Sequence, residues 1–182
     1  EYPDTSPRHL QFVYHSILAL NTTLAPFNRR VEVFYGEAID IFNYLNKCFD
    51  INSLFSYRES GTQSTWQRDK QIKVVCNQHQ IDWQESQRDG ILRGITNRVD
   101  WNKQWHITMH KPVIKNVYSI CKEDPLKHSF LIPKKLETQL NDYFKQFQPP
   151  GELNAWRYLK SFTNQRGFNY QKHISKPTES RM

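Results

Sequence analysis

The stretch SLFSYRESGTQSTWQRDKQIKVVCNQHQIDWQE, residues 53–85, decides the fold class. It opens with an alternating, aromatic-rich run at 53–57, which is typical of a short strand. A helical pattern follows, with Ser64 as candidate N-cap, and a second short strand is predicted at 81–85. A strand that returns through a helix usually pairs in parallel with the first. The stretch therefore predicts an α/β fold with a parallel, Rossmann-like sheet and flanking helices.

Upstream of residue 53, predicted helices and strands continue to alternate along the chain. Ser6-Pro7 is a helix-start signal, and the apolar pattern that follows it ends near Pro26. The apolar positions expected to face the core are Leu10, Val13, Tyr14, Ile17, Leu18 and Leu20. A β-rich run at 31–35 predicts another strand, and apolar residues between 39 and 45 predict another amphipathic helix. Three strands are few for an open parallel sheet. We therefore expect that one or two N-terminal strands of the domain are missing from this chain.

Downstream of Gly90 the pattern changes. Trp101, Trp105 and Met109 recur every four residues and predict a short helix with an aromatic stripe. Prolines punctuate residues 111–150, which we interpret as an irregular interdomain linker. A final amphipathic helix is predicted at 153–163 and a polar loop after it, so a second, helical domain is expected to begin at residue 151.

The amino-acid composition indicates a folded protein and limits the partners and compartment that we expect for it. The 182 residues have a mean hydropathy of -0.78 but 14% aromatics, which indicates a packed fold rather than disorder. The net charge of +7 is compatible with a polyanion partner, although solubility alone would explain it. Cys48, Cys76 and Cys121 have no C-x-x-C spacing, so we expect reduced thiols and a cytoplasmic protein. No apolar run approaches the roughly 20 residues that span a bilayer.

Candidate ligand positions lie where the predicted strands end, as in other open α/β sheets. These ends hold the sequences Tyr35-Gly36-Glu37, Tyr57-Arg58-Glu59 and Trp83-Gln84-Glu85. The chain has no G-x-G-x-x-G and no Walker loop, which argues against an ordinary dinucleotide or ATP site. His106 and His110 have the spacing of a helical zinc site, but no glutamate follows the first and no third ligand is near, so no metal is expected.

Four segments, in this order and spacing, resemble the DNA photolyase and cryptochrome family. They are Ser6-Pro-Arg-His-Leu-Gln-Phe followed by Val-Glu-Val-Phe-Tyr-Gly-Glu37; Tyr57-Arg-Glu-Ser-Gly61 with Arg68-Asp69; Ile81-Asp-Trp-Gln-Glu85 with Gly90-Ile-Leu-Arg; and Gly151-Glu-Leu-Asn-Ala-Trp-Arg-Tyr-Leu-Lys-Ser-Phe with Tyr170 and Pro177. The resemblance implies a partial antenna domain at 1–110, a linker at 111–150 and a truncated start of the FAD-binding helical domain at 151–182. The family's first strand, its serine-rich flavin-phosphate turn and its tryptophan chain are absent from this sequence.

The resemblance also implies three site residues. Tyr170 matches a tyrosine near the flavin phosphates, and its alternative is a loop tyrosine packed on the last helix. Arg58 and Glu59 fall where family members contact an antenna chromophore, a folate or deazaflavin, and their alternative is a charged pair facing solvent. A carboxylate can accept hydrogen bonds from a pterin edge, which is the chemistry such a contact requires. No catalytic residue is assigned.

Four other polar or aromatic residues are expected to support the fold rather than to bind a ligand. Arg68 and Asp69 are expected on the exposed side of their helix, paired with neighbours. Trp101 and Trp105, at four-residue spacing, are expected to form an apolar face that docks the linker rather than an electron relay.

The functional expectation is a fragment of a deoxyribodipyrimidine photolyase-type lyase. In that family reduced FAD, excited by blue light, splits pyrimidine dimers in DNA by electron transfer. The alternatives are a cryptochrome-type signalling protein without repair activity and an unrelated nucleotide-binding α/β module. The full-length protein is expected to be a monomer that binds damaged DNA and no membrane, and the fragment alone is expected to be inactive.

Overall fold

A computed structural model describes residues 6–59, 61–87, 90–92, 95–142 and 147–170. The chain divides into two compact units. Residues 34–117 form one, here called the sheet unit, and residues 1–33 with 118–182 form the other, here called the helical unit. Each unit is described by itself.

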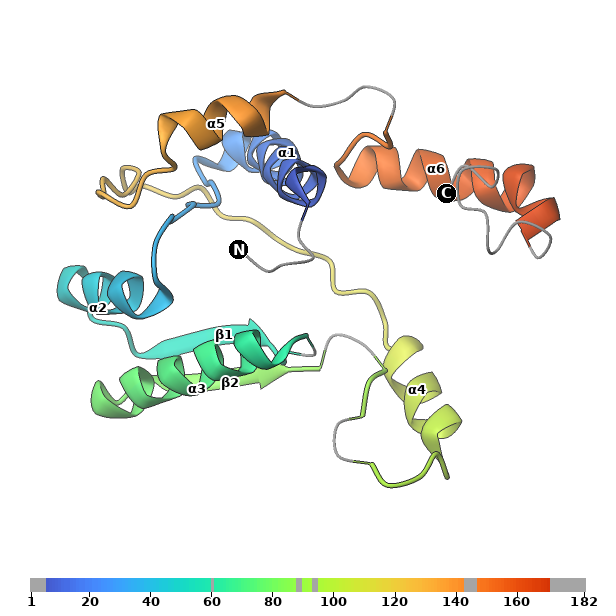
Figure 1. The fold of residues 1–182 in the computed structure, drawn as a ribbon, viewed down its shortest axis with the longest axis horizontal. Coiled ribbons are helices and arrows are strands. Elements are labelled where there is room, and N and C mark those ends of the chain that lie inside the picture. Colours follow the sequence, from blue (N-terminus) through green and yellow to red (C-terminus); the bar gives the residue numbers. More distant parts are fainter. Residues whose placement is uncertain (1–5, 60, 88–89, 93–94, 143–146, 171–182) are drawn as a thin grey trace. The chain divides into compact units, whose positions relative to one another are not determined.

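The sheet unit is built around a strand–helix–strand crossover (Figure 1). Its elements are α2 (Ala38–Cys48), β1 (Ser53–Tyr57), α3 (Gln63–Gln78), β2 (Asp82–Ser86) and α4 (Trp101–Met109). The two strands pair in parallel, with Ser53 opposite Asp82 and Tyr57 opposite Ser86. Both predicted strands and the parallel pairing are confirmed, and the chain has the mixed α/β fold that the sequence predicts.

The core of the sheet unit lies on one face of the strands. Ile72 and Cys76 of α3 pack with Ile81, and the side chains of α2 close over them. Cys76 is completely buried, and this burial raises the pKa of its thiol, although nearby Lys73 opposes the shift. Side chains along β1 alternate between the two faces of the sheet, and Phe55 and Tyr57 lie on the face away from this core, where they are 72% and 62% exposed. One face of the sheet is therefore covered and the other is not, within the described residues.

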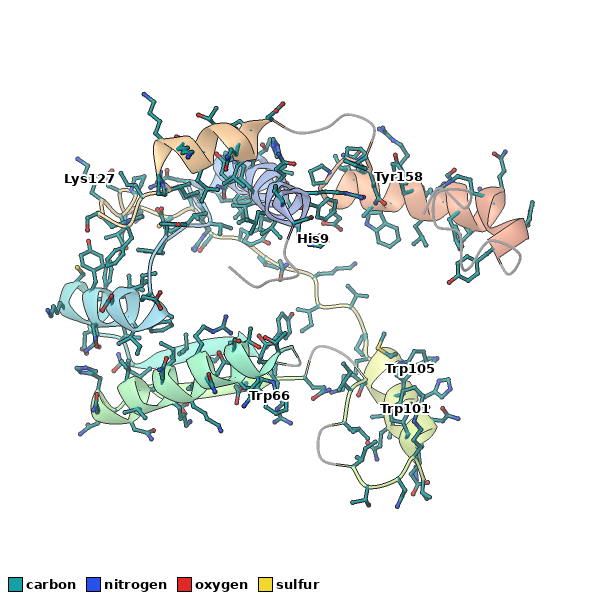
Figure 2. The ribbon with its side chains drawn as sticks, in the orientation of Figure 1. His9, Trp66, Trp101, Trp105, Lys127 and Tyr158 are labelled. Carbon is teal, nitrogen blue, oxygen red and sulfur yellow. The ribbon has the colours of Figure 1, made fainter. Side chains whose placement is uncertain are left out.

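The helical unit contains a long helix packed against a short one. Its elements are α1 (Pro7–Leu24), the 3-10 turn η1 (Ala25–Phe27), α5 (Lys134–Asn141), α6 (Glu152–Asn164) and the 3-10 turn η2 (Arg166–Asn169). At the start of α1, the Ser6 backbone N–H donates to Nδ1 of His9 at 3.3 Å, which satisfies a donor that precedes the helix. Figure 2 labels His9 in the first turn of α1.

Residues 118–123 run beside the end of α1 and η1. The Cys121 N–H donates to the Phe27 carbonyl at 2.9 Å, and the Asn28 amide donates to the Cys121 carbonyl at 2.8 Å. Arg29 reaches the Ser119 carbonyl at 2.7 Å through Nε. Asn28 has a left-handed φ of 50°, which asparagine tolerates, and it ends the 3-10 turn. These contacts fix the segment to η1 without forming a strand.

The strand expected at 31–35 is not formed, so that prediction is wrong. The Val31 N–H donates to Oδ1 of Asn21 at 2.7 Å, and Nδ2 of Asn21 lies 3.5 Å from the Val31 carbonyl. The side chain of Asn21 thus takes the backbone groups that a neighbouring strand would have paired. β-propensity needs a partner strand, and the described residues supply only β1 and β2.

Two other expectations are corrected. The stretch 111–150 was expected to be irregular, but it contains α5, which packs on α1. On α1, the predicted apolar positions Val13, Leu18 and Leu20 are 57%, 42% and 43% exposed, while the buried positions are Gln11 and Leu24.

The remaining helix predictions are confirmed to within a residue or two, as for α3, whose N-cap is Thr62 rather than Ser64. The domain division at 110 and 150 stays a prediction. Pro177 and the polar tail from residue 171 lie outside the described residues. Among the helices described, none is long and apolar enough to cross a membrane.

Candidate functional site

The candidate site is the loop between the carboxyl end of β1 and the first turn of α3. The Arg58 N–H donates to the Ser86 carbonyl at 2.9 Å, one step beyond the last pair of the parallel ladder. This bond fixes the backbone where β1 ends. Thr62 is the N-cap of α3, and the Thr65 hydroxyl donates to the Thr62 carbonyl at 2.7 Å. The loop is therefore held at both ends.

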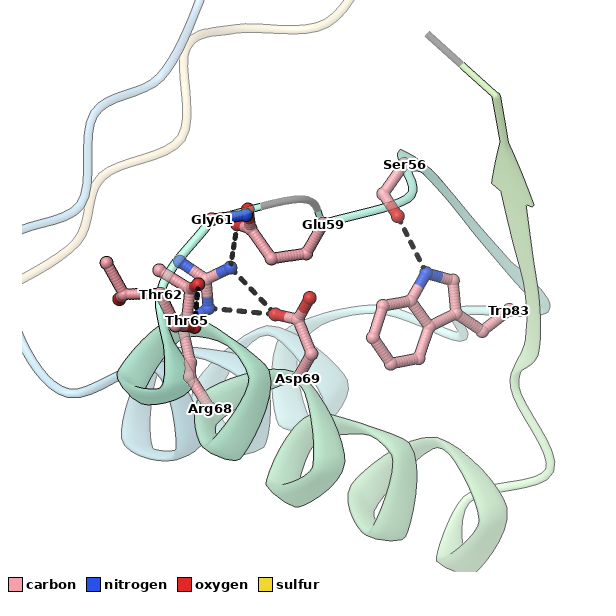
Figure 3. A network of polar contacts seen from close by, with 8 residues as sticks. All are labelled: Ser56, Glu59, Gly61, Thr62, Thr65, Arg68, Asp69 and Trp83. Carbon is pink, nitrogen blue, oxygen red and sulfur yellow. Dashed lines mark hydrogen bonds and ion pairs between the residues drawn. The ribbon is translucent and has the colours of Figure 1, made fainter. Parts of the chain in front are cut away.

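Glu59 is the centre of a polar network in this loop (Figure 3). Its Oε1 accepts a hydrogen bond from the Gly61 N–H at 2.5 Å, and its Oε2 pairs with Nη2 of Arg68 at 3.3 Å. The same guanidinium group pairs with Asp69 at 2.7 Å. Because Arg68 is 45% exposed, solvent screens these pairs, and each contributes on the order of 1 kcal/mol or less. The network orients the loop more than it stabilises the fold.

Gly61 is the residue that lets this network close. A Cβ at this position would lie 2.8 Å from Oε1 of Glu59 and 3.2 Å from the Thr65 hydroxyl. Glu59 also lies at the N-terminal end of α3, where the exposed N–H groups of a helix favour negative charge. The carboxylate therefore works first as a clamp that joins the loop before α3 to Arg68 on that helix.

Trp83 closes the inner side of this region. Its Nε1 donates to the Ser56 hydroxyl at 2.9 Å, across the two strands (Figure 3). The ammonium group of Lys73 lies 5.7 Å from a Trp83 ring centroid. A half-buried indole needs a partner for its N–H, and Ser56 supplies it. The alternation of side chains along β1 and β2 places both residues on the covered face.

The structure separates the two residues expected at an antenna site. Glu59 is half-buried and bound to Gly61 and Arg68, whereas Arg58 is exposed and forms no hydrogen bond or ion pair through its side chain with any described residue. The expected pairing of Arg68 and Asp69 with neighbours is confirmed. An exposed guanidinium group on a fixed backbone can bind an anionic or planar group.

Tyr170 belongs to the helical unit, at the end of η2. It is half-buried, and its ring meets the Phe162 ring of α6 edge-on, with centroids 5.6 Å apart. Arg166 braces the same turn, because its guanidinium donates to the Tyr158 carbonyl at 2.8 Å and to the Ser161 hydroxyl at 3.0 Å. The tyrosine thus packs on the last helix, as its structural interpretation predicted. A flavin contact by its hydroxyl stays a prediction.

The histidine pair of α4 is arranged by helix geometry. His110 and His106 have ring centroids 5.2 Å apart, and Nδ1 of His110 lies 3.0 Å from the His106 carbonyl. Across the described ranges, no group of three His, Cys, Asp or Glu side chains is placed to hold a metal ion.

Comparison with known proteins defines the class of fold. No family profile matches the sequence, and no curated protein matches it. Among solved structures, the chain is similar to a photolyase from the archaeon Sulfolobus tokodaii, whose structure contains two FAD molecules and was described as implying a novel light-harvesting cofactor. The two are 19% identical with a TM-score of 0.50, over 80% of this chain and 33% of that chain. The chain thus spans about a third of that photolyase, and the likeness establishes a photolyase-like α/β fold.

Sequence reasoning missed two features of the site. The first is the role of Gly61, although a glycine directly before a Thr N-cap is a readable loop signal. The second is that the carboxylate of Glu59 is bound within its own loop. Nothing in the sequence distinguishes that arrangement from an outward-facing carboxylate, because the distinction depends on where α3 places Arg68.

Proposed function

We propose that this chain is part of a blue-light flavoprotein of the photolyase and cryptochrome family, and that the intact protein is a carbon–carbon lyase that repairs pyrimidine dimers in DNA. The observation that carries the proposal is the fold likeness, over 80% of this chain, to a photolyase whose structure contains two FAD molecules. The chain would supply an α/β antenna domain and the first helix of a flavin domain. By itself it would be inactive.

Residues of this chain would contribute edges of two binding sites. Arg58 would contact an antenna folate or deazaflavin, since its guanidinium group is exposed on a fixed backbone. Glu59 would add only the acceptor capacity left over from Gly61 and Arg68. Tyr170 would make one contact with FAD through its hydroxyl group, since its ring packs edge-on against Phe162. When bound, reduced FAD would supply the electron that splits the dimer.

The partners follow from the same proposal. The intact protein would bind DNA that carries pyrimidine dimers, as a cytoplasmic monomer, and its net positive charge would assist that binding.

The test is the absorption spectrum and the blue-light repair activity of the intact protein, purified in the dark. Flavin bands together with light-dependent dimer repair would support the proposal. Flavin without repair would favour the cryptochrome alternative. An intact protein that binds no flavin would refute both and leave an α/β module of another function.

Two substitutions test the individual contacts. Arg58→Ala should lower the occupancy of the antenna pigment, measured by its near-ultraviolet band, while Lys47→Ala, an exposed cation at the end of α2, should not. Tyr170→Ala should lower the FAD content of the purified protein, while Tyr35→Ala, a tyrosine that is 51% exposed in the sheet unit, should not. Equal losses in a variant and its control would count against that contact.

A further inference from the structure

The helix α4 carries a row of four aromatic rings that the proposed function does not use. Trp101 and Trp105 have centroids 6.4 Å apart, Trp105 meets His106 edge-on at 5.1 Å, and His106 lies 5.2 Å from His110. Figure 2 shows the two tryptophans on this helix. At about 1.5 Å rise and roughly 100° turn per residue, the row extends for roughly 14 Å along the axis and winds about halfway around the helix.

The ring of Trp105 packs against backbone, and the other three rings are at least partly accessible to solvent. A Cβ on Gly90 would lie 2.1 Å from Cδ1 of Trp105, so the indole of Trp105 lies directly on the Gly90 backbone. Trp101 is only half-buried, and His106 and His110 are exposed. In the described part of the chain, α4 makes no extensive contact with another helix or strand.

The charge around this helix is locally positive. Between residues 98 and 117 there are four Lys or Arg side chains and a single acidic one, Asp100. The guanidinium carbon of Arg98 lies 6.0 Å from a Trp101 ring centroid, and Lys103 is exposed one turn further along. The preceding residues of the sheet unit, 34–97, hold seven basic and eight acidic side chains. The net positive charge of this unit is thus confined to α4 and the residues that flank it.

We propose that α4, with Arg98, Lys103 and Lys111, binds single-stranded nucleic acid. Bases stack on the exposed rings, and the cations contact the phosphates on either side. Aromatic rings interleaved with cations are the composition of a sequence-tolerant single-strand platform. α4 also exposes Ile107 and Met109, at 52% and 51%, but the cations around them and the exposed histidines distinguish it from a face made only to dock a hydrophobic protein. This activity does not depend on the proposed function, since it needs neither flavin nor light.

The test is fluorescence anisotropy of labelled (dT)16 and (rU)16 with the full chain. Three or four phosphate contacts on a single strand give a slope of log K against log salt of roughly -2 to -3, so affinity should fall roughly 20- to 50-fold between 50 and 200 mM salt. Trp101→Ala should weaken binding at least about fivefold through the loss of one stacked base. The double variant Lys103→Glu, Lys111→Glu should make the salt slope shallower by about 1.4.

Matched controls lie on α3 in the same unit. Trp66→Ala removes an indole that is 43% exposed, and Lys70→Glu reverses an exposed cation, and both should bind within about twofold of the parent. Circular dichroism checks that each variant is folded, and the charge reversals at exposed sites preserve the test if Trp101→Ala unfolds. Binding of either oligonucleotide with these losses supports the proposal. It is overturned if the chain binds neither, if the α4 variants match their controls, or if blunt duplex binds as tightly regardless of Trp101.

Discussion

Gln11 offers the sharpest test of the helical unit, because a polar side chain that is only 4% exposed joins α1 to α5. Its amide donates to the Gln139 carbonyl at 2.7 Å and to the Asp142 carbonyl at 2.8 Å. One turn later on α1, Nε2 of His15 lies 2.9 Å from the Leu140 carbonyl. These two side chains satisfy carbonyls at the end of α5 that have no partner within their own helix.

Gln11→Ala should therefore destabilise the packing of α5 on α1 by about 2 kcal/mol. Two hydrogen bonds contribute about 1 kcal/mol each, and the stranded carbonyls add a desolvation cost. The better helix propensity of alanine returns only a few tenths of a kcal/mol. A loss of about 2 kcal/mol corresponds to roughly 30-fold faster hydrogen exchange at amides that exchange by opening of this unit.

The assay is native-state hydrogen exchange resolved at residues 134–141, with the amides of α3 as internal reference. Gln67→Ala, an exposed glutamine on α3, is the matched control and should change exchange in α5 by less than about twofold. If Gln11→Ala leaves the exchange of the α5 amides unchanged, the two hydrogen bonds from Gln11 do not hold α5 on α1, and the reasoning is refuted.

Four further outcomes are expected. Gly90→Ala should destabilise the α4 region by about 1–3 kcal/mol because its Cβ overlaps Trp105, and the cost should largely vanish in a Trp105→Ala background, as a double-mutant cycle by hydrogen exchange would measure. Burial keeps Cys76 protonated above the pKa of an unfolded cysteine, so the sheet unit should lose stability as pH rises past about 8.5, and a Cys76→Ala variant that lacks this dependence in urea titrations would confirm the source. Under native conditions a thiol reagent should modify exposed Cys48 far faster than Cys76, and equal rates would contradict the burial. Arg68→Ala should cost no more than about 1 kcal/mol in the same titrations, since a larger loss would mean that the Glu59 network is structural rather than orienting.

Local pattern was sufficient for most elements of this chain. Helical spacing of apolar residues placed α1 and α3, the Ser6 N-cap fixed the start of α1, and a period of two placed β1 and β2. Because β1 and β2 are joined by a single crossover helix, their parallel pairing followed from connectivity. Each of these decisions depends on residues within a few positions of one another, or on a connection of known length, so the sequence contains them.

The tertiary structure decided what depends on partners distant in the chain. Residues 31–35 have the composition of a strand, but Asn21 takes the backbone groups of Val31 in place of a ladder. The segment 134–141 is short and lies among prolines, and Gln11, over a hundred residues away, binds the carbonyls at its end.

At the candidate site, nothing in the sequence distinguished Arg58 from Glu59. In the structure, Glu59 is hydrogen-bonded to Gly61, whereas Arg58 is exposed. A side chain's hydrogen-bonding partner is set by where another element places its donor. The position of Arg68 on α3 therefore decided the role of Glu59, which the local sequence could not.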